Sequence, residues 1–166
     1  MKFNKQSLIA NERICMISDY RAPREDIHFT LEQIGQLEMV AALEGFGGAD
    51  PETTARLLDG GARFYEQVWA PSNRPADLSG SVLRDGKVQV HEAFHDIYRR
   101  TMAGGWNVLP RTPVDGEGGM PWLIHAVFIE MASSGNGSLS MLTGLIAGAV
   151  ELLEAHASEE QKALYI

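Results

Sequence analysis

Cysteine is almost absent from this sequence: Cys15 is the one cysteine among 166 residues. A single cysteine excludes an intramolecular disulfide framework and a zinc site built from several cysteines, so we expect a reducing compartment, the cytoplasm. Basic residues are also few, 14 against 22 acidic ones, and the net charge is −8. This balance argues against unaided binding to nucleic acid, which requires positive charge to displace counterions from phosphates.

Long apolar segments are missing as well. No apolar run approaches the roughly 20 residues that cross a bilayer, so we expect no membrane span. Near the start only residues 8–10 resemble the apolar core of a signal peptide, which is too short. Residues 1–17 match nothing that follows in pattern. We interpret them as a disordered arm, an artificial extension or a mis-assigned start with Met16 as the true initiator, and favour the last two.

What remains has the composition of one globular domain, with 45% hydrophobic and 22% charged residues. Apolar residues recur every three or four positions from Ile27 to Ala41, which predicts a helix capped by Asp26 and ended by the glycines at 45–48. Asp50 followed by Pro51 predicts a second helix start. We expect Pro71 to end that helix.

Two glycines, Gly60 and Gly61, interrupt the second helix, where each costs about 1 kcal/mol relative to alanine. They indicate either close packing against another helix or a weak helix. Asp85 and Gly86 between short β-prone runs predict one small protruding hairpin. Further helices are expected over residues 92–103, 121–133 and 138–156, and a sixth begins at Ser158 with a capping box. The fold class is therefore all-α, with about six helices and one small β-hairpin.

A formal H-E-x-x-H motif occupies residues 91–95. On a helix it places two imidazoles, here His91 and His95, on one face to bind zinc, with Glu92 as the base. The residues before it have strand character, however, and the nearest downstream third ligands are Asp115 or Glu117 in a glycine-rich loop. A solvated helix start is the favoured interpretation, and a zinc hydrolase is a remote alternative. The glycines at 115–119 lack the lysine of a phosphate-binding loop and are interpreted as a turn.

The fifth expected helix carries small residues at helical spacing: Ser140, Thr143, Gly144 and Ala147. Such a face either lets a neighbouring helix approach closely or forms the wall of a slot for an apolar ligand. The residues alone favour close packing, because protein interiors rarely leave voids. No catalytic triad can be read from the sequence, and no catalytic residue is assigned.

Several segments, in order, resemble the acyl-CoA dehydrogenase family. The first, YRAPREDIHFTL at residues 20–31, is similar to the opening Y-x-A-P-x-x-D-I-x-F-x-L of the subgroup that includes 3-methylmercaptopropionyl-CoA dehydrogenases. Later segments resemble the family's V-x-A-P-L-N-R, its hairpin, A-G-W, G-G-x-G-L-P and H-G-S-E-E-Q-K; they lie at 68–74, 84–86, 104–106, 116–121 and 155–162. Each is weak alone, but together they cover nearly the whole chain.

The resemblance implies that residues 18–166 are the amino-terminal helical domain of an FAD-dependent acyl-CoA dehydrogenase, truncated before its flavin-binding β-domain. The complete enzyme removes the α proton of an acyl-CoA thioester as hydride passes to the flavin. In this interpretation Ser140, Thr143, Gly144 and Ala147 line the acyl slot. The flavin-binding stretch and the catalytic glutamate belong to parts not in this sequence, so we expect no FAD bound by this chain alone, and no activity.

The chain is thus interpreted as an excised piece, a truncated gene product or one half of a split enzyme. A missing segment or a second chain would supply the FAD-binding and carboxy-terminal domains, and we expect a homo-oligomer or heteromer. The alternative from another class is a non-catalytic helical interaction module. It differs by predicting no gain of flavin binding with any partner.

Overall fold

A computed structural model describes residues 19–106 and 120–166. The expected arm at 1–17 and the glycine-rich turn at 115–119, with Asp115 and Glu117, lie outside the described residues. Within them the fold is all-α with one two-stranded antiparallel hairpin, which confirms the predicted class. In chain order the elements are α2 (Arg24–Phe29), π-helical η1 (Thr30–Ile34), α3 (Leu37–Ala41), α4 (Pro51–Phe64), π-helical η2 (Tyr65–Trp69), α5 (Ala70–Ser79), β1 (Val82–Arg84), β2 (Lys87–Gln89), α6 (Ala93–Ala103), α7 (Trp122–Gly135), α8 (Gly137–His156) and α9 (Glu159–Tyr165).

The first predicted helix is interrupted and begins earlier than expected. Pro23, not Asp26, precedes α2, and its carbonyl accepts the first helical hydrogen bond, from the amide of Ile27 at 2.9 Å. Proline is tolerated before the first turn because an amide hydrogen there has no partner within the helix. Asp26 lies in the first turn, where its charge still favours the positive end of the helix dipole. Farther on, Gln36 adopts a left-handed backbone conformation with φ of 49° and separates η1 from α3.

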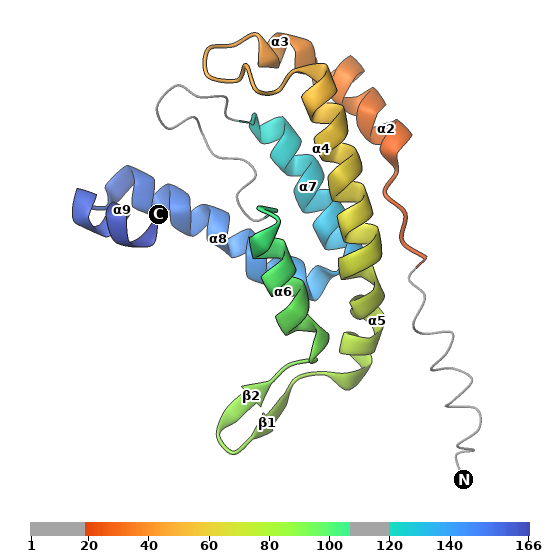
Figure 1. Cartoon of the computed structure of the whole chain (residues 1–166), viewed down its shortest axis with the longest axis vertical. Helices are drawn as coiled ribbons and strands as arrows, with labels where there is room; N and C mark the ends of the chain where they lie inside the picture. The colour runs from red at the N-terminus through yellow and green to blue at the C-terminus, as the bar shows by residue number, and fades with distance from the viewer. Residues whose placement is uncertain (1–18, 107–119) are drawn as a thin grey trace.

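The longest feature in Figure 1 is the rod formed by α4, η2 and α5 in succession. It begins as predicted: the carboxylate of Asp50 accepts from the amide of Thr53 at 2.9 Å, and Pro51 takes the first helical position. The prediction that Pro71 ends this helix is wrong. Proline lacks an amide hydrogen and crowds the carbonyl one turn earlier. The π-helical turn η2 immediately before Pro71 widens the helix there, and α5 continues to Ser79.

The core lies where α7 packs along this rod, with α2 on the other side. The close-packing interpretation of the glycine pair is confirmed, because a Cβ on Gly61 would lie 2.5 Å from Cε1 of Phe128 in α7. Trp69 is 1% exposed and forms the centre of the rod's buried side. Aromatic rings surround this contact; the neighbouring ring pairs have centroids 5.1–6.4 Å apart and involve Phe64, Tyr65, Trp69, Trp106 and Phe128.

The hairpin projects from one end of the helical body, as predicted (Figure 1). Leu83 pairs with Val88, and Asp85 and Gly86 both have positive φ, 50° and 72°. Two successive positive φ values are those of a type I′ turn, whose twist matches that of the strands. Near the carboxyl terminus, Ser158 caps α9 with a complete capping box, which confirms the predicted start of this helix.

Helix α8 extends away from the body and carries α9 at its far end (Figure 1). It has 20 residues and is apolar enough to cross a membrane by length and composition alone, and 6% of its apolar window is buried within the described structure. The expectation that no segment reaches this length therefore does not hold for α8. One helix of this kind is weak evidence for a membrane span.

Candidate functional site

The four expected slot residues all lie on α8. Ser140 and Thr143 are half-buried, Gly144 is exposed, and the side chain of Ala147 is outside the description. The hydroxyl of Ser140 donates to the carbonyl of Gly137 at 2.8 Å, and that of Thr143 lies 3.5 Å from carbonyls one turn earlier. Ser and Thr in helices commonly bond to their own backbone in this way. Both hydroxyls are thus occupied within the helix.

The small-residue face of α8 is open in the described part of the chain. A Cβ built on Gly144, or on Gly148 one turn later, would meet no described atom within 4 Å. Close packing against another helix, the interpretation that the residues alone favoured, is therefore not what the described residues do. No part of the chain that the structure describes covers Gly144 or Gly148.

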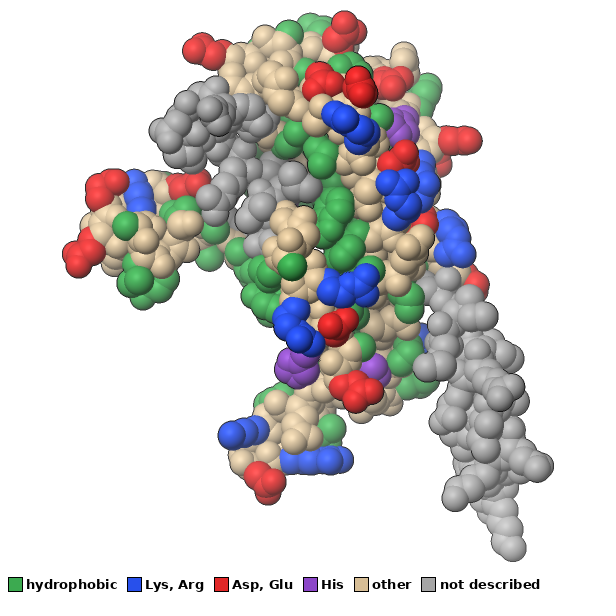
Figure 2. Space-filling model, viewed as in Figure 1, with side chains coloured by type: hydrophobic (Ala, Val, Ile, Leu, Met, Phe, Trp, Pro, Cys, Tyr) green, Lys and Arg blue, Asp and Glu red, His purple; other side chains and the backbone are tan. Residues whose placement is uncertain are grey.

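Bulky apolar side chains adjoin this face. Met141, Leu145 and Leu152 are 67%, 72% and 61% exposed, and their spacing of four and then seven places them on one side of α8. Figure 2 shows hydrophobic side chains on the α8–α9 lobe next to acidic ones. Contiguous exposed apolar patches larger than a few hundred Å² often mark protein–protein interfaces, so this ridge is a candidate contact surface.

A buried polar joint connects the start of α8 to the body. Asn136 is 0% exposed, and its side-chain oxygen accepts from the amide of Leu139 at 3.1 Å, which caps α8. Its side-chain nitrogen donates to the hydroxyl of Ser72 in α5 at 2.9 Å. Ser72 in turn donates to the carbonyl of Trp69 at 2.7 Å. The joint thus ties α8 to the junction of η2 and α5.

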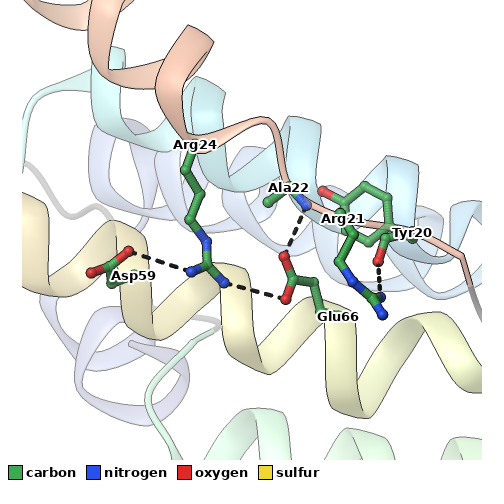
Figure 3. A network of polar contacts seen from close by, with 6 residues as sticks. All are labelled: Tyr20, Arg21, Ala22, Arg24, Asp59 and Glu66. Atoms are coloured by element: carbon green, nitrogen blue, oxygen red, sulfur yellow. Dashed lines mark hydrogen bonds and ion pairs between the residues drawn. The ribbon is translucent and has the colours of Figure 1, made fainter.

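A second polar cluster anchors the amino-terminal end of the described chain (Figure 3). Glu66 accepts from the amide of Ala22 at 3.0 Å and from Nη2 of Arg24 at 3.2 Å. Nη1 of Arg24 also lies 3.8 Å from the carboxylate of Asp59. Nearby, burial raises the pKa of Tyr20 to about 12, and the carboxylates of Glu130 and Glu66 add to the rise. This cluster holds the segment before α2 against α4 and η2.

The two motif histidines are not on one helical face. His91 precedes α6, and its Nδ1 lies 3.3 Å from the amide of Ala93, in the manner of a helix cap. His95 is exposed on the first turn of α6. Within residues 19–106 and 120–166 there is no group of three or more histidine, cysteine or acidic side chains arranged to hold a metal ion. The structure gives the zinc alternative no support there.

Two curated proteins are similar to this chain. It is 29% identical over 147 residues to 3-methylmercaptopropionyl-CoA dehydrogenase of Ruegeria pomeroyi and 27% identical over 155 residues to butyryl-CoA dehydrogenase of Syntrophomonas wolfei. Each alignment covers 89% of this chain and 25% of the relative. The chain is homologous to acyl-CoA dehydrogenases. It spans about a quarter of the length of these relatives, and no family model matches it.

In this acyl-CoA dehydrogenase homologue, the residues that sequence reasoning missed are those of the two polar clusters. The Gly-Asn-Gly break at 135–137 contained a signal for Asn136, because asparagine is a preferred helix cap. Its partner Ser72 is 64 residues away, and Glu66 is 44 residues from Ala22. No local pattern indicates pairings over such separations.

Proposed function

We propose that this chain is the helical, substrate-slot part of an FAD-dependent acyl-CoA dehydrogenase, which forms a double bond between the α and β carbons of an acyl-CoA thioester. In this proposal α8 provides one wall of the acyl slot through Ser140, Thr143, Gly144 and Ala147. The single observation that carries the proposal is the open small-residue face of α8 in a chain homologous to these enzymes.

The chemistry of that face suits an aliphatic chain. Gly144 adds no side-chain bulk, and the hydroxyls of Ser140 and Thr143 are engaged with carbonyls of their own helix. An acyl chain lying along α8 would therefore leave no polar side chain of these residues without a hydrogen bond. Slots for apolar ligands are lined in this way, with few polar groups.

FAD would accept the hydride in the complete enzyme. Among the described residues, the buried side-chain polar atoms without a partner belong to Arg24, Thr54 and Glu154, on three separate helices, and give no support for placing a flavin there. We therefore assign no flavin contact and no catalytic base to this chain. Its proposed contribution is to bind the acyl group and exclude water from it, and the chain is inactive alone.

The exposed ridge of Met141, Leu145 and Leu152 is the surface expected to meet the rest of the enzyme. Burial of apolar area contributes roughly 25 cal/mol per Å², so covering these side chains favours association. We propose that the covering part is the FAD-binding and carboxy-terminal portion, carried on a further segment or a second chain. The isolated chain is then expected to self-associate, and the proposed location is the cytoplasm, without membrane insertion.

Reconstitution tests this proposal. The purified chain is mixed with a polypeptide covering the portion of the Ruegeria pomeroyi relative that this chain does not match, in the presence of FAD. We expect no visible flavin absorbance from this chain alone, and bound flavin that bleaches on adding an acyl-CoA after mixing. A mixture that never retains flavin, although both polypeptides are folded, would contradict the proposal and favour an interaction module.

Two matched variants test the slot itself. Gly144→Leu places a bulky side chain on the open face of α8, where nothing within 4 Å opposes it, so the chain should fold normally. In the reconstituted mixture it should retain flavin but lose at least tenfold in acyl-CoA affinity. Ala42→Leu adds a bulky side chain at an exposed position at the end of α3, outside α8, and should bind acyl-CoA normally. If both variants bind acyl-CoA with equal affinity, these residues do not line the slot.

A further inference from the structure

Beyond its first turn, α8 has no fully buried side chain among the described residues. Leu139, 2% exposed, is the last described side chain of α8 that is buried; those from Ser140 to His156 are half-buried or exposed, with Ala147 outside the description. Among the described residues, packing along α8 beyond Leu139 is therefore only partial. The polar joint at Asn136 is the part of this connection that is fully enclosed.

The hydrogen bonds of this joint have one consistent arrangement. The amide of Leu139 is a donor, so the Asn136 atom that faces it must be the oxygen, and the nitrogen must face Ser72. Ser72 accepts that bond while donating its own hydrogen to the carbonyl of Trp69. In each of these three bonds a donor meets an acceptor, and rotation of the Asn136 amide by half a turn would set its nitrogen against the Leu139 amide and break the bond that caps α8.

The joint reaches a third helix through Trp69. The indole nitrogen of Trp69 donates to the hydroxyl of Thr101 in α6 at 3.1 Å, and Thr101 donates to the carbonyl of Ile97 at 2.8 Å. Trp69 and Thr101 are 1% exposed, and Ser72 is 5% exposed. Buried networks in which all members are satisfied hold one geometry strongly, because any displacement leaves polar groups unpaired in a dry environment.

A long helix held at one end amplifies small changes there. Glu151 lies 15 residues beyond Asn136, or about 22 Å along the helix axis, so a tilt of about 15° at the joint would displace it by about 6 Å. The proposed slot residues lie between these two positions. Their placement against the body is therefore sensitive to the geometry of the joint.

We propose that Asn136 is a positioning residue: through its paired hydrogen bonds to Leu139 and Ser72, it sets the direction of α8. The relevance of this role to the acyl slot rests on the proposed function, whereas the orientation of α8 does not. Asn136 contacts no substrate in this proposal and acts through the helix that it caps.

Distances between spin labels test the role in the chain as it exists. With Cys15 replaced by serine, nitroxides are placed at Arg63→Cys on α4 and Glu151→Cys on α8, both exposed positions. In Ser72→Ala, and separately in Asn136→Ser, the distribution should shift by several Å or broaden about twofold. Serine at 136 keeps a hydroxyl that can cap α8 but is too short to reach Ser72. This variant therefore removes the bond to Ser72 while the helix cap is retained.

Two controls separate orientation from general loosening. A second label pair, Arg63→Cys with Ala126→Cys on α7, reports the helical body and should not change in either variant. Ser158→Ala removes the cap of α9 without touching the joint and should leave the Arg63–Glu151 distances unchanged. The double variant should match the single variants, because each breaks the same link.

An unchanged Arg63–Glu151 distribution in Ser72→Ala would overturn the proposal, as would an equal change in the Arg63–Ala126 pair. If Asn136→Ser does not fold, Ser72→Ala decides alone, since it keeps the cap of α8. No flavin or acyl-CoA enters this experiment. It can therefore fail while reconstitution succeeds, or succeed while reconstitution fails.

Discussion

Phe128 occupies the space that a side chain on Gly61 would need. A Cβ at this glycine would lie 2.5 Å from Cε1 and 3.0 Å from Cζ of the Phe128 ring. The ring stacks against Trp106, with centroids 5.8 Å apart, and meets Tyr65 edge-on. The ring therefore cannot move aside freely, and the glycine in the last turn of α4 permits α4 and α7 to approach.

Overpacking costs about 1–3 kcal/mol and the gain in helix propensity offsets about 1 kcal/mol, so Gly61→Ala should destabilise the chain by up to about 2 kcal/mol. Gly148→Ala is the matched control, since it makes the same change inside a helix where no described atom lies within 4 Å. It should be neutral or stabilising. Urea unfolding followed by circular dichroism measures both, and a stabilised Gly61→Ala variant would contradict the packing argument.

Thr101→Val should cost about 1–3 kcal/mol in the free energy of unfolding, because the shape is kept but the buried indole nitrogen of Trp69 loses its acceptor. The Trp69 indole N–H signal in an NMR spectrum should shift strongly. Thr143→Val provides the comparison, because Thr143 is half-buried and its hydroxyl bonds to carbonyls of its own helix. Equal losses in the two variants would rule out a specific role for the Trp69–Thr101 bond.

Glu66→Gln should destabilise the attachment of the amino-terminal segment by about 1–3 kcal/mol, because a charged acceptor of two hydrogen bonds is replaced by a neutral one. Hydrogen exchange at the Ala22 amide reports this directly and should become faster. Glu52→Gln also removes the carboxylate of an arginine pair, with Arg56, but both of its side chains are largely exposed. Its effect should stay below about 0.5 kcal/mol.

The sequence predicted best the features that depend on neighbouring residues. Asp50 and Pro51 start α4, Asp85 and Gly86 turn the hairpin, and Ser158 caps α9, as expected. In each case the side chains that determine the local conformation lie within four residues of one another. Such local rules need no knowledge of the rest of the fold.

The errors arose where tertiary contacts outweigh local rules. Pro71 ends a helix in isolation, but the π-helical turn before it, packed into the core through Trp69, carries the helix on. From the residues alone, before the resemblance is considered, the small face of α8 is expected to be a packing surface, and the described chain leaves it open. Which face of a helix meets a partner depends on the packing of distant segments. The slot assignment rests on the resemblance and stays a prediction until binding is measured.

Tyr20, which lies before α2, should make the free energy of unfolding depend on pH in the alkaline range. Burial, with the negative charges of Glu130 and Glu66 adding to it, raises the pKa of Tyr20 from 10.0 to about 12 in the folded chain. Between these values the unfolded chain has lost a proton that the folded chain keeps. Ionisation of Tyr20 should therefore leave the free energy of unfolding unchanged below about pH 10 and lower it as the pH rises from 10 toward 12.

Tyrosinate absorbance and urea midpoints across this range test the expectation. Burial also raises the pKa of Tyr65, so two late-titrating tyrosines contribute, and Tyr20→Phe is needed to assign one of them. That variant should lose one late-titrating group and show a shallower fall in stability. Glu66→Gln should move the Tyr20 titration toward lower pH, because it removes one of the charges that oppose ionisation. If Tyr20→Phe instead loses a tyrosine that titrates near 10, the phenol is not shielded in solution, and the amino-terminal segment is not held against η2 as the Glu66 contacts require.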